Sequence, residues 1–268
     1  MNSQSYRIVI SAIAAQIIIF MLASCSVKED RRVCPCILEV IFSDREIIDD
    51  PVTLVGWSDE EVFGVRVKTA DYPEKYTHKA PRTMISFGAA EGVVNCLQKG
   101  HSLIVPKGYE CDSLYVFSEL VDCTGETAQT TVKFHKQFAT VNLGVTNTDY
   151  EAGDYSFVVE SHSCGIDMLS YAPIEGDFRC IPRLYEDKKY QYRVPRQCDE
   201  SMTLAVTHYS GDTAIFPLGR LVSSIGYDWE AEDLQDIYII LDIARGRIGV
   251  GVAGWEDTED FELSTVEL

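Results

Sequence analysis

The chain is poor in basic residues, and this shortage excludes some kinds of partner. Lys and Arg number 23 against 42 Asp and Glu, which gives a formal net charge of −19 at pH 7. A polyanion of this kind is repelled by nucleic acid and by anionic membrane surfaces. The acidic residues are spread along the chain, which is typical of a solvated surface. We therefore expect no nucleic-acid partner.

The sequence also lacks the motifs that carry catalysis or hold a metal. Its five histidines stand apart, without H-x-x-x-H spacing or a nearby G-x-S-x-G elbow. His162-Ser163-Cys164 could pair a thiol with a base, but neighbouring strand residues rarely converge, and a structural cysteine is favoured. Cys34-Pro35-Cys36 lacks a second pair of ligands and is interpreted as structural. We predict no enzyme activity, no cofactor and no metal site.

Two further patterns match ligand sites only in part. The segment 249–254 has the G-x-G-x-x-G spelling of a dinucleotide-binding loop, but it lies within a predicted strand and no βαβ unit fits after it. Small residues on one strand face indicate instead a close neighbour. Asp149, Glu151 and Asp154 surround Gly153, yet the twelve-residue calcium loop with its terminal Glu is missing. We interpret this second pattern as a solvated turn.

The N-terminal segment has the composition of an export signal. Arg7 precedes an apolar run over 8–21, and Leu22-Ala23-Ser24-Cys25 follows the run. Polar residues interrupt it, and it is shorter than the roughly 20 residues needed to span a bilayer. A positive start, a short apolar stretch and small residues before a cleavage point are typical of a secretory signal that is removed. The Leu-Ala-Ser-Cys string resembles the lipobox of bacterial lipoproteins, whose cysteine takes a diacylglyceryl group and becomes the new N-terminus.

The lipobox resemblance implies a lipid-anchored protein. Residues 1–24 would be the signal peptide, and residues 25–35 a linker lipidated at Cys25. One acyl chain holds a protein at a membrane marginally, and two hold it stably. Ser26 differs from the Asp that retains many Gram-negative lipoproteins in the inner membrane. Lys28-Glu29-Asp30 is similar to the short signal that sends lipoproteins of Bacteroides-type bacteria to the cell surface, so we expect Lys28, Glu29 and Asp30 to direct this chain to the outside of the outer membrane.

Eight cysteines remain once Cys25 is lipidated. They are Cys34, Cys36, Cys96, Cys111, Cys123, Cys164, Cys180 and Cys198. An even number in an exported protein suggests disulfides, but eight cysteines allow 105 complete pairings. The sequence alone leaves the pairing open.

Short segments with period-two hydrophobicity dominate the rest of the chain. Cys36, Leu38, Val40 and Phe42 alternate with other positions, as expected for a half-buried strand. Further strands are predicted over 52–57, 61–69, 82–87, 102–105 and 113–120, and then over 139–146, 155–159, 189–194, 202–207, 237–243 and 248–252. Two groups of short, turn-bounded strands indicate an all-β protein made of two sandwiches. We predict domains over 36–125 and 126–255.

One short helix and one hairpin are predicted in the second domain. Leu218, Leu221, Val222 and Ile225 have the i, i+3, i+4, i+7 spacing of a helix face, between Pro217 and Gly226. The segments 237–243 and 248–252 alternate on either side of Arg245-Gly246, which predicts a hairpin with its turn at these two residues.

Several stretches, in order along the chain, resemble the FimB-type family of fimbrial anchors, the lipoproteins that tether the fimbriae of Bacteroides-type bacteria to the outer membrane. The first half contributes the lipobox cysteine, Cys34-Pro35 and Val105-Pro106-Lys107-Gly108-Tyr109. The second half contributes the segments 138–143, 164–167, 194–197, 216–219, 226–229 and 248–255. The resemblance covers nearly the whole mature chain. It implies two transthyretin-like β-sandwich domains in tandem.

The resemblance also implies a mechanical role without enzyme activity. Members assemble by strand exchange, in which main-chain hydrogen bonds supply affinity and alternate side chains fill pockets. An anchor ends the polymer at the membrane, limits fimbrial length and has the fimbrial shaft subunit as its partner. Arg31-Arg32 follows the anchor cysteine closely. Stalk subunits of these fimbriae are cut after a basic residue to open an acceptor groove, so cleavage after Arg32 would favour a polymerising or tip fimbrillin.

The tail over 256–268 is a candidate donor strand. Its residues Phe261, Leu263 and Thr265 alternate with Glu262, Ser264 and Val266. An ordinary frayed C-terminus, which the acidic residues of the tail also suit, is the alternative.

A glycan-binding surface lipoprotein is a rival of a different class. Trp57, Trp229 and Trp255 could stack on sugars. Large aromatic side chains more often fill sandwich cores, however, and we favour that interpretation for all three.

Overall fold

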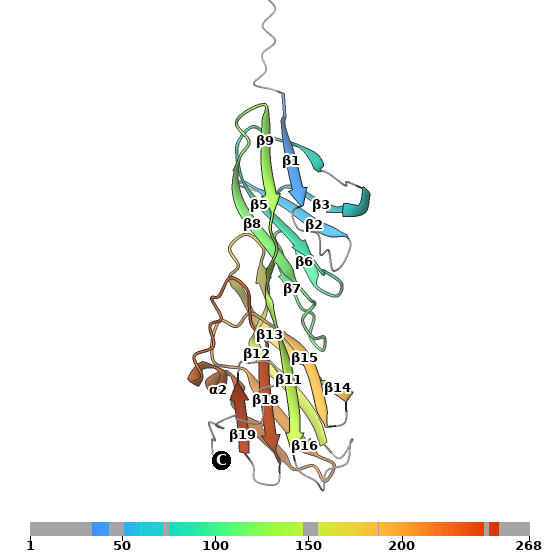
Figure 1. Ribbon diagram of the computed structural model, residues 1–268, viewed down its shortest axis with the longest axis vertical. Helices are drawn as coiled ribbons and strands as arrows, with labels where there is room; N and C mark the ends of the chain where they lie inside the picture. The colour runs from blue at the N-terminus through green and yellow to red at the C-terminus, as the bar shows by residue number, and fades with distance from the viewer. Residues whose placement is uncertain are drawn as a thin grey trace, which may run out of the picture. The chain divides into compact units, whose positions relative to one another are not determined.

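The computed structural model describes residues 34–42, 51–59, 61–71, 75–146, 155–186, 188–243 and 247–251, and most of them lie in β-strands (Figure 1). The strands are β1 (Cys36–Phe42), β2 (Val52–Trp57), β3 (Glu61–Val67), β4 (Tyr76–Ala80), β5 (Met84–Glu91), β6 (Leu97–Lys99), β7 (Ser102–Ile104), β8 (Tyr115–Asp122), β9 (Thr127–Val132), β10 (His135–Lys136), β11 (Phe138–Thr146), β12 (Tyr155–Asp167), β13 (Pro173–Cys180), β14 (Arg183–Glu186), β15 (Lys189–Pro195), β16 (Thr203–His208), β17 (Thr213–Phe216), β18 (Ile237–Asp242) and β19 (Arg247–Gly251). A 3₁₀ turn, η2, covers Thr69–Asp71, and the helix α2 covers Leu218–Ser224.

A first pair of sheets encloses one apolar core. A three-stranded sheet has the order β4-β1-β9, and a five-stranded sheet has the order β10-β8-β5-β2-β3. In β1 every second residue is buried, which places Cys36, Leu38, Val40 and Phe42 on the inner face. These side chains share a core cluster with Leu54 and other residues of the five-stranded sheet. The two sheets therefore form a sandwich.

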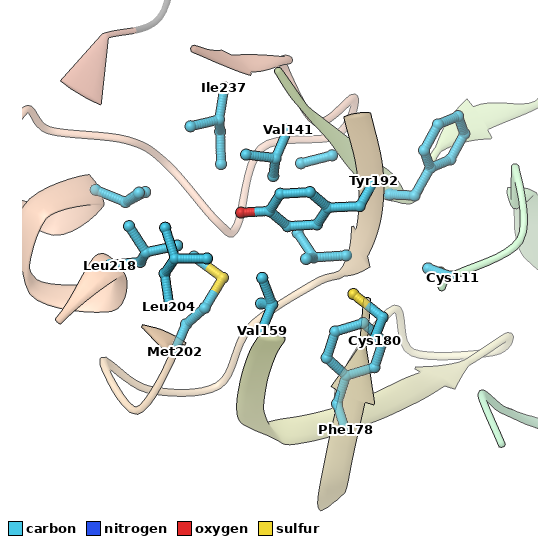
Figure 2. Close-up of a cluster of buried hydrophobic side chains, with 14 of the residues drawn as sticks. Cys111, Val141, Val159, Phe178, Cys180, Tyr192, Met202, Leu204, Leu218 and Ile237 are labelled. Carbon is cyan, nitrogen blue, oxygen red and sulfur yellow. The ribbon is translucent and has the colours of Figure 1, made fainter. Parts of the chain in front are cut away.

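A second pair of sheets encloses the larger core. One sheet has the order β14-β15-β11-β18-β19, and the other has the order β17-β16-β12-β7-β6, with β13 also paired to β12. Figure 2 shows Val141, Tyr192 and Ile237 of the first sheet close to Val159, Met202 and Leu204 of the second, with Leu218 of α2 beside them. All seven side chains are buried. The fold is thus an all-β sandwich fold, and the short helix predicted over 218–225 is present as α2.

Most of the local predictions are confirmed. Every predicted strand overlaps an observed one, and β1 and β2 have the predicted bounds. Pro217 and Ile225 cap α2, and Gly226 follows with a φ of 75°, a left-handed conformation that glycine adopts without strain. The strands β18 and β19 pair antiparallel, although the turn at Arg245-Gly246 lies outside the described residues. In the described part, no helix is long and apolar enough to cross a membrane.

The sheets change later along the chain than the boundary predicted near residue 126. β9 begins at Thr127 and pairs in parallel with β1, so it belongs to the first pair of sheets. The hairpin β6–β7 lies before that boundary, yet β7 pairs with β12 of the second pair. After β7 the chain returns to the first pair with β8, β9 and β10, and it passes back to the second pair between β10 and β11. The polar stretch before residue 127 is a turn between β8 and β9, and its composition resembles that of a linker.

The carboxylate of Asp112 organises the segment that leads into β6. Its two oxygens accept hydrogen bonds from the backbone N–H groups of Val94 (2.9 Å), Asn95 (2.7 Å) and Cys96 (2.8 Å), and from the Asn95 side-chain amide (2.9 Å). Asp112 is 3% exposed. Burial raises the pKa of this carboxyl group. The four hydrogen bonds lower the pKa by more than burial raises it, so the pKa lies below its ordinary value.

Replacing Asp112 with asparagine should lower the free energy of unfolding by about 1–3 kcal/mol at pH 7, because the charged acceptor of several buried hydrogen bonds is lost. Urea unfolding measures the difference. The carboxyl pKa is depressed in the folded state, so its contribution is complete above the ordinary value of about 3.9 and is lost as the pH falls through the folded-state value. The two proteins should therefore converge in stability below about pH 4. Asp177→Asn, on a side chain that is 80% exposed, is the control and should leave stability unchanged. A gap between wild type and D112N that did not narrow in acid would contradict this account.

Candidate functional site

Several residues to which the sequence assigns a role lie outside the described residues. These are the lipidation residue Cys25, the export signal Lys28, Glu29 and Asp30, the candidate donor residues Phe261, Leu263 and Thr265, the acidic turn 149–154, and Trp255. Lipidation, surface export and strand donation therefore stay predictions.

The glycine pattern over 249–254 and the His162-Ser163-Cys164 motif do not form ligand or catalytic sites in the described residues. Gly249 and Gly251 lie on β19 and pair with β18, so this part of the glycine pattern is a strand. The His162 imidazole lies 3.5 Å from the Asp199 carboxylate, whereas the Cys164 thiol donates to the Glu175 carbonyl oxygen at 3.8 Å. These contacts do not form a thiol–base pair between His162 and Cys164.

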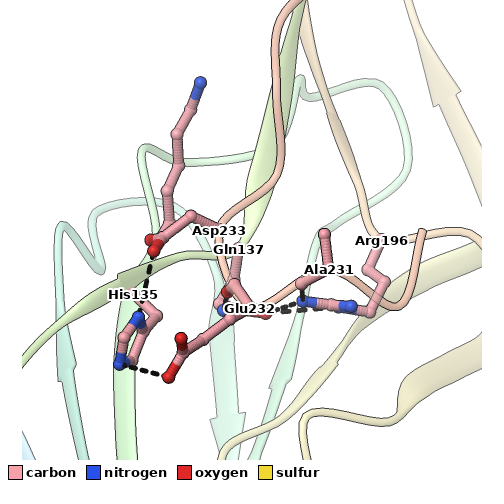
Figure 3. Close-up of polar contacts among 7 residues, drawn as sticks. His135, Gln137, Arg196, Ala231, Glu232 and Asp233 are labelled. Atoms are coloured by element: carbon pink, nitrogen blue, oxygen red, sulfur yellow. Dashed lines mark hydrogen bonds and ion pairs between the residues drawn. The ribbon is translucent and has the colours of Figure 1, made fainter. Parts of the chain in front are cut away.

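A buried arginine holds the loop that connects α2 with β18, residues 226–236. Arg196 follows β15 and is 5% exposed. Its guanidinium donates to the Gln137 side-chain oxygen from Nε (3.2 Å) and Nη2 (2.5 Å) and to the Ala231 carbonyl oxygen (2.8 Å) (Figure 3). It also donates to the Trp229 carbonyl oxygen. Burial lowers the pKa of Arg196 from its ordinary value. Two segments that carry the family resemblance, 194–197 and 226–229, thus meet through these hydrogen bonds, which we call the Arg196 network.

The same loop binds the crossover between the two pairs of sheets. His135 of β10 places Nδ1 3.1 Å from a carboxylate oxygen of Asp233 and Nε2 3.0 Å from one of Glu232 (Figure 3). The Asp233 carboxylate also accepts the backbone N–H of Lys136 at 2.6 Å. The backbone N–H of Leu234 donates to the Lys136 carbonyl oxygen at 3.0 Å. This loop therefore fixes the path of the chain between β10 and β11.

The cluster of His135, Glu232 and Asp233 has the donor types of a metal site but not the arrangement. One ligand atom from each lies within 4.8 Å of the others. Structural zinc takes four protein ligands and catalytic zinc three, and a metal-bound imidazole uses its second nitrogen as a hydrogen-bond donor. Here each ring nitrogen already faces a carboxylate, so a metal on Nε2 would have only Glu232 as its second protein ligand. The geometry suits an imidazole ring held in place by two carboxylates, one at each ring nitrogen.

The two described tryptophans pack against neighbouring groups. Trp57 is half-buried and makes an edge contact with the ring of His101, with ring centres 4.6 Å apart. Trp229 packs against the second core and against the Tyr227 ring, 4.5 Å away. Both contacts agree with a packing role.

Two adjoining cavities lie beside the edge strand β14. One has a volume of about 310 Å³ and the other about 500 Å³, and both are lined by Tyr185 and Gln191. Tyr185 is 73% exposed. The Gln191 amide donates to the Asn142 side-chain oxygen at 3.0 Å, and Asn142 is paired in register with Tyr238 of the next strand. Amides beside aromatic rings are able to bind a neutral polar ligand.

No feature of the sequence pointed to this surface. The strand β14 is four residues long and all four are exposed, so it has no hydrophobic alternation. Its partner β15 was predicted, but the aromatic lining comes from strands far apart in sequence. Only the register of β14, β15, β11 and β18 brings these residues to one face.

Comparisons with known proteins show the same fold in solved structures from Bacteroides and Porphyromonas. No protein-family model and no curated protein matches the sequence. Three solved structures are similar over 83% of this chain: a candidate polysaccharide-binding protein of Bacteroides thetaiotaomicron (14% identity, 99% of that chain, TM-score 0.58), a candidate adhesin of Bacteroides ovatus (11%, 94%, 0.57) and the fimbrial anchor protein Mfa2 of Porphyromonas gingivalis (10%, 98%, 0.57). At these identities the likeness establishes the shared all-β sandwich fold.

Proposed function

We propose that this chain is a non-enzymatic lipoprotein of the outer membrane that anchors fimbriae to the cell surface and limits their growth by strand exchange. The observation that carries the proposal is the combination of a lipobox at Cys25 with a fold similar to that of a fimbrial anchor protein over 83% of the chain. A lipid at one end and a partner held by β-augmentation at another region are sufficient for mechanical tethering. No step of this task requires chemistry at a catalytic site.

The position of β1 favours an anchor over a polymerising subunit. β1 is hydrogen-bonded to β4 on one side and to β9 on the other. Cleavage after Arg32 would remove the lipid, but β1 starts only at Cys36 and would keep its place in the sheet. Such a cut therefore would not open a groove at β1. Cleavage would therefore remove the lipid without creating an acceptor groove at β1, which favours a protein that keeps its lipid.

The N-terminus of the protein from cells tests the lipid anchor. Mass spectrometry of the N-terminal peptide should find Cys25 as the first residue, carrying at least two acyl chains. A mature N-terminus at Val33 would show cleavage after Arg32 and would favour a polymerising or tip fimbrillin.

Deleting residues 256–268 should leave a folded, membrane-bound protein that no longer retains fimbriae, since the alternating face of Phe261, Leu263 and Thr265 would be lost. Fimbriae shed into the medium and fimbriae on washed cells are the quantities to compare. Glu262→Ala together with Ser264→Ala changes the opposite face and should leave attachment intact. Normal attachment by the deleted protein would exclude the tail as the donor strand.

Glycan binding is the second candidate function, favoured by the two cavities that share Tyr185 and Gln191. Aromatic and amide side chains are typical of sugar sites. A glycan array that retains the wild type and loses Tyr185→Ala would support it. Tyr209→Ala, on an exposed tyrosine of the β16–β17 turn, is the control.

A further inference from the structure

Cys36 and Cys123 approach each other from the two sheets of the first sandwich. Cys36 is the first residue of β1, in the three-stranded sheet, and Cys123 directly follows β8, in the five-stranded sheet. Both side chains are 0% exposed and belong to the same apolar core. The Cys36 thiol is one of the groups that raise the pKa of the Cys123 thiol, after burial itself. Both are free thiols in this structure.

Backbone contacts hold the two cysteines at this position. Cys36 is paired with Ala80 of β4, and the Cys123 N–H donates to the carbonyl oxygen of Thr83, three residues after Ala80, at 3.1 Å. On the other side, the N–H of Ile37 donates to the carbonyl oxygen of Glu126 at 2.9 Å. Two separate contacts therefore bring together the chain around Cys36 and the chain around Cys123.

We propose that Cys36 and Cys123 are oxidised to a disulfide that joins the two sheets and retains β1. The two thiols lose two protons and two electrons and form one S–S bond. A disulfide oxidant accepts both electrons, its own S–S bond breaks, and it leaves as two thiols. Oxidising compartments outside the cytoplasm supply oxidants of this class.

Burial determines when this bond forms. Burial, with the neighbouring Cys36 thiol, raises the pKa of Cys123 to about 12. Thiol–disulfide exchange requires a thiolate, which is scarce at such a pKa. The bond therefore forms during folding, before β1 closes the core, and it then resists added reductant for as long as the protein stays folded.

The disulfide also changes which part of the chain carries load, and this consequence depends on the proposed tethering function. Residues 25–35 connect the lipid to Cys36, so tension from the membrane enters the fold at β1. In the reduced protein, the hydrogen bonds of β1 to β4 and β9 resist this tension. In the oxidised protein, tension passes from Cys36 to Cys123 through a covalent bond. Residues 37–122 then lie in a closed loop outside the loaded path.

Peptide mapping tests the bond itself, independently of any fimbrial role. Protein isolated from cells is denatured with an alkylating agent that blocks free thiols, and it is then digested without reductant. We expect a cross-linked peptide pair that contains Cys36 and Cys123. Full-length protein refolded with oxidised glutathione should yield the same pair. Alkylation of both cysteines in the cellular protein, or a link from Cys123 to another cysteine, would overturn the proposal.

Two variants separate Cys36 from its exposed neighbour. Cys34→Ser should keep the cross-linked pair, because Cys34 is outside the core, and Cys36→Ser should lose it. A cross-link that survived in C36S and vanished in C34S would assign the bond to Cys34 and contradict the proposal.

Stretching single molecules tests the change in load. Full unfolding of the oxidised protein should release about 300 Å less chain than unfolding of the reduced protein, the extended length of residues 37–122. Equal lengths would contradict the closed loop. If cells contain the cross-linked protein and it holds no fimbriae, the proposed tethering function is wrong. The disulfide would still stand.

Discussion

Arg196→Met is expected to lower the free energy of unfolding by about 3–5 kcal/mol, because three acceptors lose their shared hydrogen-bond donor. Methionine fills similar volume but donates no hydrogen bond. The Gln137 side-chain oxygen and the carbonyl oxygens of Trp229 and Ala231 would then lose the donor that satisfies them. Each buried acceptor left without a partner costs about 1–3 kcal/mol. Urea unfolding followed by tryptophan fluorescence measures the stability.

Two further variants make the result for Arg196 specific. Arg196→Lys should be intermediate, because an ammonium group cannot donate to three separate acceptors as the planar guanidinium does. Arg179→Met removes an exposed ion pair with Glu160, at 3.3 Å, and should cost less than about 1 kcal/mol. If R196M were as stable as R179M, the Arg196 network would not support the fold.

Gly165→Ala is expected to lower the free energy of unfolding by about 3 kcal/mol or more, because extra atoms in a closely packed place force the backbone to move. A Cβ atom at this position would lie 2.1 Å from the Leu103 carbonyl oxygen and 3.0 Å from the Ile104 Cα. Gly165 is paired with Ile104 where β12 meets β7. Both nearest atoms are backbone, so no side-chain rotation relieves the clash. Thermal unfolding measures the loss, and hydrogen exchange in 97–104 should rise with it.

Gly125→Ala is the matched control for Gly165. A Cβ atom there would lie 3.5 Å from the Thr127 carbonyl oxygen, an ordinary contact, and no strained backbone angle is involved. The melting temperature should stay close to that of the wild type. Equal melting temperatures for G165A and G125A would show that β7 can move away from β12 without loss.

Hydrophobic alternation made the strands with an apolar face predictable and left the edge strands β9 and β14 hidden. β1 and β2 were predicted with their observed bounds because their buried faces are apolar. β9 reads Thr-Ala-Gln-Thr-Thr-Val and β14 is exposed throughout, so neither has a strand signal. The parallel pairing of β9 with β1 joins residues far apart in sequence, and no local pattern encodes it. The predicted boundary therefore fell before β9.

The parts of the candidate site also differ in how far the sequence predicts them. The lipobox is a local signal and could be recognised from consecutive residues. The segments around Arg196 and Trp229 carried a family resemblance, but their contact through a backbone carbonyl group became evident only in the folded chain. The choice of Cys123 as the neighbour of Cys36 likewise depends on two sheets facing each other. The sequence alone chooses none of the 105 complete pairings of eight cysteines. Long-range packing indicates one pair, Cys36 with Cys123.

Affinity isolation of the intact protein from detergent-solubilised outer membranes tests the central claim most directly. An anchor holds one end of a polymer, so the account predicts that fimbrial shaft subunits accompany the protein in molar excess and that it carries its lipid. Recovery of lipidated protein without any fimbrial subunit would contradict the account. So would its presence, without lipid, at regular intervals along detached shafts.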